Sequence, residues 1–206
     1  MKKTSPYARI RIRERLCIES AAEPCGVVMF GASGDLARRK VLPSLFSLFA
    51  KQLVSPLFFL VGYGRTALTT EAFRAHVRHS LTAADADATR DTDTVNQFLA
   101  ACDYVAGDYD DPARFVALRE RLETLQRAHA THGNLLAYLS VPPSMYAPIV
   151  AQLGRAGLTR EHCDGHGWMR VIVEKPFGRD LASARTLDKA LRATLTEHQI
   201  YRIDHY

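Results

Sequence analysis

The sequence contains no run of about 18 apolar residues, which excludes a helix that spans a membrane. It has only 4 cysteines in 206 residues, and none of them forms a CxxC pair. A scaffold held by disulfides needs denser cysteine, so we expect a reduced protein of the cytoplasm. A secretory signal is not expected either, because arginines interrupt the apolar residues between Ile10 and Arg13.

Residues 16–206 carry no net charge, so the net charge of the chain comes from its N-terminal arm. Of 27 Lys and Arg and 22 Asp and Glu in all, six basic residues and one acid lie in residues 1–15, so the rest holds 21 of each sign. A basic arm of this kind can bind nucleic acid or an anionic membrane. It is also Arg-rich like an organelle transit peptide, although Glu14, Glu19 and Glu23 argue against one. We favour a solvated leader over residues 1–25, and expect neither nucleic acid nor a membrane as a partner.

Short apolar runs alternate with amphipathic stretches from residue 26 to the end, with no repeat and no internal linker. This pattern predicts one α/β domain, residues 26–206, with a Rossmann-like, doubly wound and mainly parallel sheet. Asp111 followed by Pro112 is a typical helix start. The strands are expected at 27–30, 57–61, 104–106, 135–139, 171–173 and 200–203, and the helices at 36–50, 70–81, 95–101, 112–129, 145–153 and 180–194.

The loop GASGDLA, residues 31–37, lies between the first expected strand and the first helix. A dinucleotide pyrophosphate needs small residues there, so that backbone N–H groups at a helix N-terminus can approach it. We expect Gly31 to allow the tight turn, Gly34 the close approach and Ala37 the close packing of helix on strand. The spacing is GxxGxxA rather than GxGxxG, which leaves an ordinary turn equally open. Its place after the first strand favours nucleotide binding.

The end of the second strand indicates which nucleotide. Sites for NAD usually carry an acid there for the ribose 2′-hydroxyl, whereas sites for NADP favour an arginine for the 2′-phosphate. Here the sequence is VGYGRT, with Arg65 and no acid. A solvated loop arginine is the alternative, but together with the glycine loop Arg65 favours NADP.

Two segments near the C-terminus are also dense in functional groups. Lys175 follows an expected strand, and Pro176 restricts it to an extended conformation and can form a cis bond. Such a lysine can hold a phosphate or a hydroxyl, although a solvated strand end is the commoner interpretation. Asp204 and His205 are neighbours on an expected strand, so their side chains point to opposite faces and serve different partners.

A cluster at His162, Cys163 and His166 could suggest zinc. Its spacing matches no common structural site, and no fourth ligand is evident. We therefore expect a polar loop and no metal.

Six segments together resemble glucose-6-phosphate dehydrogenases, in the order of that family and from about residue 26 to the end of the chain. They are GASGDLARRK (31–40), VGYGR (61–65), YVAGDYDD (104–111), YLSVPPSMY (138–146), VIVEKPFGRDLASA (171–184) and QIYRIDHY (199–206). The resemblance implies oxidation of D-glucose 6-phosphate to the lactone with reduction of NADP.

The resemblance also implies roles for single residues. Arg65 would bind the 2′-phosphate, Tyr146 would lie near the nicotinamide, and Lys175 would be shared between coenzyme and sugar phosphate. His205 and Tyr206 would bind the substrate phosphate, while Asp204 would orient the catalytic histidine. The residues implied for the coenzyme loop are Gly31, Ala32, Ser33, Gly34, Asp35, Leu36, Ala37 and Arg38.

In the family that histidine lies downstream of RIDHY, in a second α+β domain that also makes the dimer contact. The sequence ends at Tyr206. We therefore expect the coenzyme-binding domain without turnover of its own, monomeric although the complete enzyme is a homo-oligomer. A non-catalytic NADP-binding module or remnant is the alternative.

Overall fold

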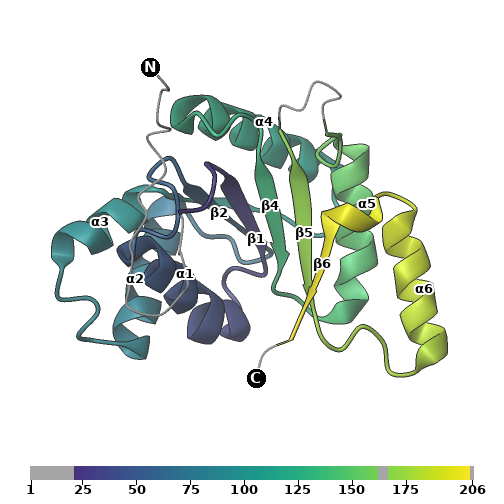
Figure 1. Ribbon diagram of the computed structural model, residues 1–206, viewed down its shortest axis with the longest axis horizontal. Helices are drawn as coiled ribbons and strands as arrows, with labels where there is room; N and C mark the ends of the chain where they lie inside the picture. The colour runs from purple at the N-terminus through teal and green to yellow at the C-terminus, as the bar shows by residue number, and fades with distance from the viewer. Residues whose placement is uncertain (1–20, 162–166, 205–206) are drawn as a thin grey trace, which may run out of the picture.

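The computed structural model describes residues 21–161 and 167–204, which form a six-stranded, all-parallel sheet (Figure 1). The strand order is β3-β2-β1-β4-β5-β6. This is the doubly wound Rossmann order, so the predicted fold class is confirmed. The strands are β1 (Gly26–Phe30), β2 (Phe59–Gly64), β3 (Cys102–Ala106), β4 (Leu135–Leu139), β5 (Met169–Glu174) and β6 (Ile200–Ile203).

Four of the described helices begin at a side-chain cap, namely Thr69, Asp91, Asp111 and Asp180. Asp111 accepts a hydrogen bond from the backbone N–H of Ala113 at 2.9 Å, as expected for the Asp-Pro start. None of the helices in the described ranges has the length and apolar composition needed to cross a bilayer. The helical segments are η1, a π-helical turn (Ala37–Val41), α1 (Leu42–Ala50), α2 (Thr70–Ala84), α3 (Thr92–Ala100), α4 (Pro112–His129), η2 (Pro143–Met145), α5 (Tyr146–Arg155), α6 (Leu181–Arg192) and η3 (Glu197–Gln199).

Two hydrophobic clusters lie on the two faces of the sheet. On one face, Phe30 of β1 packs in the cluster that includes residues of α4, α5 and α6. On the other, Met29 belongs to the cluster formed with α1, α2 and α3. All five residues of β1 are buried, because this central strand is covered on both faces.

The second strand differs from its prediction at both ends. It was expected over 57–61 with Gly62 closing it, but β2 runs from Phe59 to Gly64. Phe58 ends the turn before β2, and its N–H donates to the carbonyl of Ser55 at 3.0 Å. A Cβ at Gly62 would lie 2.6 Å from the Phe73 ring and 2.8 Å from the Tyr104 ring. Gly62 thus serves close ring packing inside the strand and does not end it.

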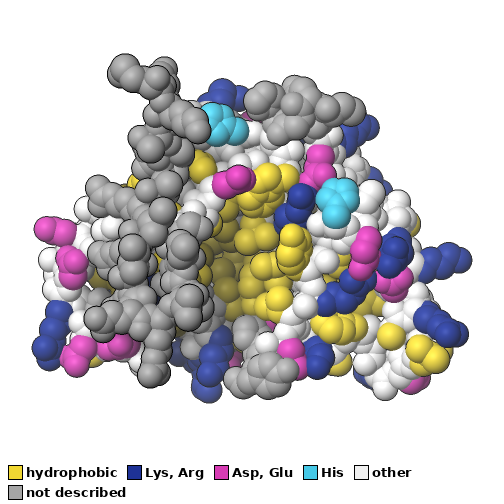
Figure 2. Space-filling model, in the orientation of Figure 1, with side chains coloured by type: hydrophobic (Ala, Val, Ile, Leu, Met, Phe, Trp, Pro, Cys, Tyr) yellow, Lys and Arg dark blue, Asp and Glu magenta, His cyan; other side chains and the backbone are white. Residues whose placement is uncertain are grey.

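One half of the sheet is covered on one face only. Leu136, Ile172 and Ile203 alternate toward the face that carries α1, α2 and α3, yet they are only partly buried. Tyr201 of β6 points to the same face and is 53% exposed. Figure 2 shows hydrophobic side chains gathered at the centre of this face. No described helix covers β4, β5 and β6 there, so the sheet exposes apolar surface that parallel sheets normally bury.

The turn after β1 is fixed by close backbone packing. Gly31 has a φ of +78°, and a Cβ on it would lie 2.2 Å from the carbonyl oxygen of Ser140. Ser140 follows β4, the neighbour of β1 in the sheet. Only glycine fits this position, for its backbone conformation and for its size.

We predict that Gly31→Ala lowers the free energy of unfolding by about 2 kcal/mol or more, because the added methyl group meets backbone at an unfavourable φ. Gly34→Ala is the matched control. Its φ is not positive, its Cβ would meet only the Gly31 oxygen at 3.0 Å, and the loss should stay below about 1 kcal/mol. Urea unfolding of both variants measures the difference. Equal stabilities would contradict the structural role of Gly31.

Candidate functional site

The sequence-predicted residues lie at the carboxyl ends of four strands. The glycine loop follows β1, Arg65 follows β2, Lys175 follows β5 and Asp204 follows β6. Because all strands are parallel, these ends share one edge of the sheet, at the bottom of Figure 1. The strand order reverses between β1 and β4, and open α/β sheets bind ligands at this reversal. His205 and Tyr206 lie outside the described residues, as do His162, Cys163 and His166.

The glycine loop is held by its own backbone. The N–H of Gly34 bonds to the carbonyl of Gly31 at 2.8 Å, and the N–H of Arg38 to the carbonyl of Gly34 at 3.0 Å. Ala32 and Ala37 are fully buried, so they pack inward, whereas Gly34 is exposed. The loop therefore offers a ligand its backbone around Gly34 at the start of a helix, which suits a phosphate.

Asp35 pairs with two arginines on the first helical turns. Its Oδ1 lies 2.8 Å from Arg38 Nη2 and 2.9 Å from Arg39 Nε. The hydrogen bond from Arg38 and the charge of Arg39 hold the pKa of the Asp35 carboxyl below its usual value, against an opposing effect of desolvation. These two ion pairs keep the Arg38 and Arg39 guanidinium groups beside the loop. The glycine pattern in the sequence did not indicate that Arg39 belongs to the site.

Arg65 lies beside a link between two loops. The hydroxyls of Ser33 and Thr66 are 3.0 Å apart, and the Tyr104 hydroxyl donates to the Thr66 carbonyl at 2.9 Å. The segment after β2 is thereby fixed to the glycine loop and to β3. Arg65 is exposed and makes no ion pair or hydrogen bond within the described ranges. Its guanidinium is available to a ligand.

A second group of contacts surrounds Lys175. Its Nζ lies 2.6 Å from Asp204 Oδ2, and the peptide bond between Lys175 and Pro176 is cis. Both side chains are partly exposed, at 57% and 31%. This ion pair brings the ends of β5 and β6 together, and leaves the ammonium where an incoming anion can reach it.

The backbone before Lys175 is held by two tyrosines. The Tyr138 hydroxyl donates to buried Glu174 at 2.5 Å, and the Tyr146 hydroxyl donates to the Glu174 carbonyl at 3.2 Å. Burial, together with the bond to Glu174, raises the pKa of Tyr138, which keeps it a neutral donor. Tyr146 is only 1% exposed, and its hydroxyl holds the backbone at Glu174 through this hydrogen bond. Sequence reasoning missed Tyr138 and Glu174.

The chemistry of these residues would suit a dinucleotide with a 2′-phosphate. Gly34 is exposed at the start of the helix, and Arg65 is a cation without an acid of its own among the described residues. Within residues 21–161 and 167–204, no group of three His, Cys, Asp or Glu could hold a metal.

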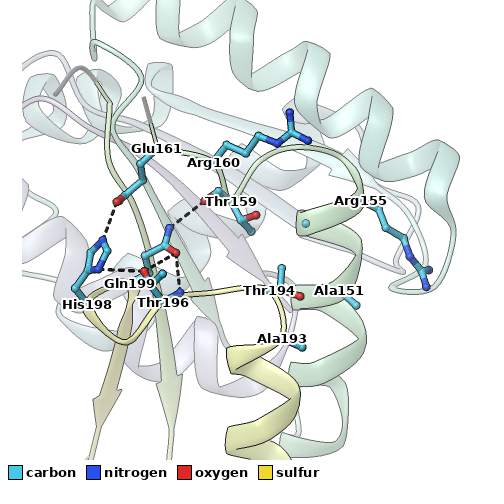
Figure 3. Close-up of a pocket in the computed structure, with 11 residues that line it drawn as sticks. Ala151, Arg155, Thr159, Arg160, Glu161, Ala193, Thr194, Thr196, His198 and Gln199 are labelled. Carbon is cyan, nitrogen blue, oxygen red and sulfur yellow. Dashed lines mark hydrogen bonds and ion pairs between the residues drawn. The ribbon is translucent and has the colours of Figure 1, made fainter. Parts of the chain in front are cut away.

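A cavity of about 710 Å³ lies at the opposite edge of the sheet (Figure 3). It lies between the ends of α5 and α6 and the segments that precede β5 and β6. Several of its polar groups already bond to one another. His198 Nε2 lies 2.8 Å from Glu161 Oε2, and the Gln199 amide donates to the Thr159 carbonyl at 3.0 Å. This cavity is separate from the edge that carries the glycine loop, Arg65 and Lys175.

The model of the family described as "Glucose-6-phosphate dehydrogenase, NAD binding domain" matches residues 28–206. The glucose-6-phosphate 1-dehydrogenase of Treponema pallidum is 42% identical over 180 residues, which is 87% of this chain and 34% of that protein. Glucose-6-phosphate 1-dehydrogenase 2 of Mycobacterium bovis is 40% identical over 185 residues, 90% of this chain and 35% of that protein.

A solved glucose-6-phosphate dehydrogenase in complex with its substrate glucose 6-phosphate superposes with a TM-score of 0.79 at 34% identity. The match covers 89% of this chain and 37% of that structure. The enzyme from Mycobacterium avium gives a TM-score of 0.74 at 32% identity, over 87% of this chain and 36% of its own. The chain thus spans about a third of the relatives that it matches. Over its NAD-binding domain, the chain belongs to the glucose-6-phosphate dehydrogenase family.

Proposed function

We propose that this chain binds NADP in preference to NAD, as the coenzyme-binding part of an enzyme that oxidises glucose 6-phosphate. The observation that carries the preference is Arg65, which follows β2 and makes no ion pair or hydrogen bond among the described residues. The backbone around Gly34 would take the pyrophosphate, and Arg38 would add positive charge beside it. An acid that could select NAD is absent from the segment 61–66.

In this proposal, Lys175 and Asp204 are the residues that face the sugar phosphate substrate. An anionic sugar phosphate would draw the Lys175 ammonium from Asp204, which frees the carboxylate to orient a histidine. In the reaction that the family implies, that histidine takes the proton of the C1 hydroxyl, and the hydride of C1 passes to NADP. NADP supplies the hydride acceptor when it is bound. This chain's residues would contribute the binding and the orientation.

Titration calorimetry of the purified chain with NADP and with NAD tests the coenzyme preference. We predict tighter binding of NADP, and a loss of about 10- to 100-fold in NADP affinity in Arg65→Ala, because a charge-assisted contact to the 2′-phosphate disappears. Arg90→Ala, in the exposed loop before α3, is the control and should bind like the wild type. Equal affinity for the two coenzymes would contradict the proposal.

We predict no detectable NADPH production by the isolated chain with glucose 6-phosphate. The described partner of Asp204 is Lys175 and not a histidine, so the described residues position no base there for the C1 hydroxyl. Absorbance at the NADPH band, measured on a preparation that binds NADP, provides the check. Turnover would show that residues of this chain supply the base.

The second candidate is a non-catalytic NADP-binding module, because Asp204 pairs with Lys175 and not with a histidine among the described residues. Either way, we propose a monomer of the cytoplasm.

A further inference from the structure

The orientation of Arg65 depends on one aromatic ring. Its guanidinium carbon lies 5.9 Å from the centre of the Tyr109 ring, over the ring face. This distance is within the range of a cation–π contact. No hydrogen bond or ion pair within residues 21–161 and 167–204 competes for the guanidinium. The contact with Tyr109 is therefore what restricts this long side chain before any ligand arrives.

The ring of Tyr109 is itself firmly placed. It is 9% exposed and packs against Phe30 of β1, at 6.4 Å between ring centres, and against Tyr63 of β2, at 6.0 Å. The Tyr63 hydroxyl donates to the carbonyl of Asp108 at 2.8 Å, which fixes the backbone next to Tyr109. Two central strands thus determine where the ring lies.

Tyr109 stays a neutral phenol. Burial raises the pKa of its hydroxyl, and the nearby Arg65 charge opposes this effect only in part. The attraction is therefore between a cation and a ring face, and it does not require a tyrosinate. The guanidinium carbon lies over the ring, and its N–H groups make no hydrogen bond within the described residues, so they remain available.

We propose that Tyr109 is a positioning residue that sets the preference for NADP over NAD by holding Arg65 at the end of β2. The inference rests on the proposed function, because it assigns to Tyr109 the preorganisation of the 2′-phosphate ligand. A mobile arginine loses conformational freedom when it binds a phosphate, whereas an arginine already packed on a ring loses less. NAD has no 2′-phosphate, so its binding should not depend on this contact. Tyr109 lies in the segment 104–111, for which the sequence analysis predicts no function beyond the family resemblance.

Calorimetry of the full chain with NADP and NAD tests the proposal in three variants. In Tyr109→Leu we expect NADP affinity to fall about three- to tenfold, with NAD affinity changed less than about twofold. Tyr109→Phe keeps the ring and should retain the wild-type ratio. Tyr109→Met fills the same space with a flexible side chain, and provides the same readout if the leucine variant does not fold.

A purely structural role would weaken both coenzymes together, or neither, and either result would overturn the proposal. The double variant Arg65→Ala with Tyr109→Leu should bind NADP no worse than Arg65→Ala alone, because both changes remove one interaction. If the wild type itself binds NADP no better than NAD, the proposed function fails and this inference with it. If the wild type prefers NADP and Tyr109→Leu keeps the preference, only the role of Tyr109 is wrong.

Discussion

The close packing of Gly31 against the carbonyl of Ser140 is the constraint on which the site depends. It joins the ends of β1 and β4, which lie in parallel register from Gly26 opposite Leu135 to Phe30 opposite Leu139. Because the chain turns there without a side chain, the loop passes directly over the strand end and its helix begins at once. The hydroxyl of Ser33 is hydrogen-bonded to that of Thr66, so the position of the segment that carries Arg65 depends on the same turn. A shift at Gly31 would displace both elements of the proposed phosphate site together.

The cationic candidate ligands at the carboxyl edge pair with carboxylates, with one exception. Arg38 and Arg39 share the single charge of Asp35, and Lys175 pairs with Asp204. These partly exposed pairs contribute little to stability. They hold cations in place while leaving them able to exchange a carboxylate for a phosphate. Arg65 has an aromatic ring in place of a carboxylate, and a ring does not compete for the guanidinium N–H groups. This difference supports the proposal that Arg65 binds the phosphate that distinguishes NADP.

Sequence reasoning succeeded where a local pattern determines structure, and failed where distant residues decide. The Asp111 cap and the β1 strand follow from neighbouring residues alone, and the sequence also indicates the tight turn at Gly31, although not its packing against Ser140. The end of β2 was placed too early, because rings from α2 and β3 make Gly62 a packing residue. The contacts of Tyr138 with Glu174 join residues that are 36 positions apart and carry no periodic signal. Nor could apolar runs show that one face of β4, β5 and β6 lacks a described helix, since a buried strand reads the same whatever covers it.

The most direct test of the account separates the 2′-phosphate from the rest of the coenzyme. Calorimetric titration of the purified chain with 2′,5′-ADP and with 5′-AMP compares two ligands that share the adenosine and the 5′-phosphate. The account predicts that 2′,5′-ADP binds at least about tenfold more tightly, since Arg65 adds one charge-assisted contact. Equal affinities, or no binding of either ligand by folded protein, would contradict a preorganised NADP site in this chain.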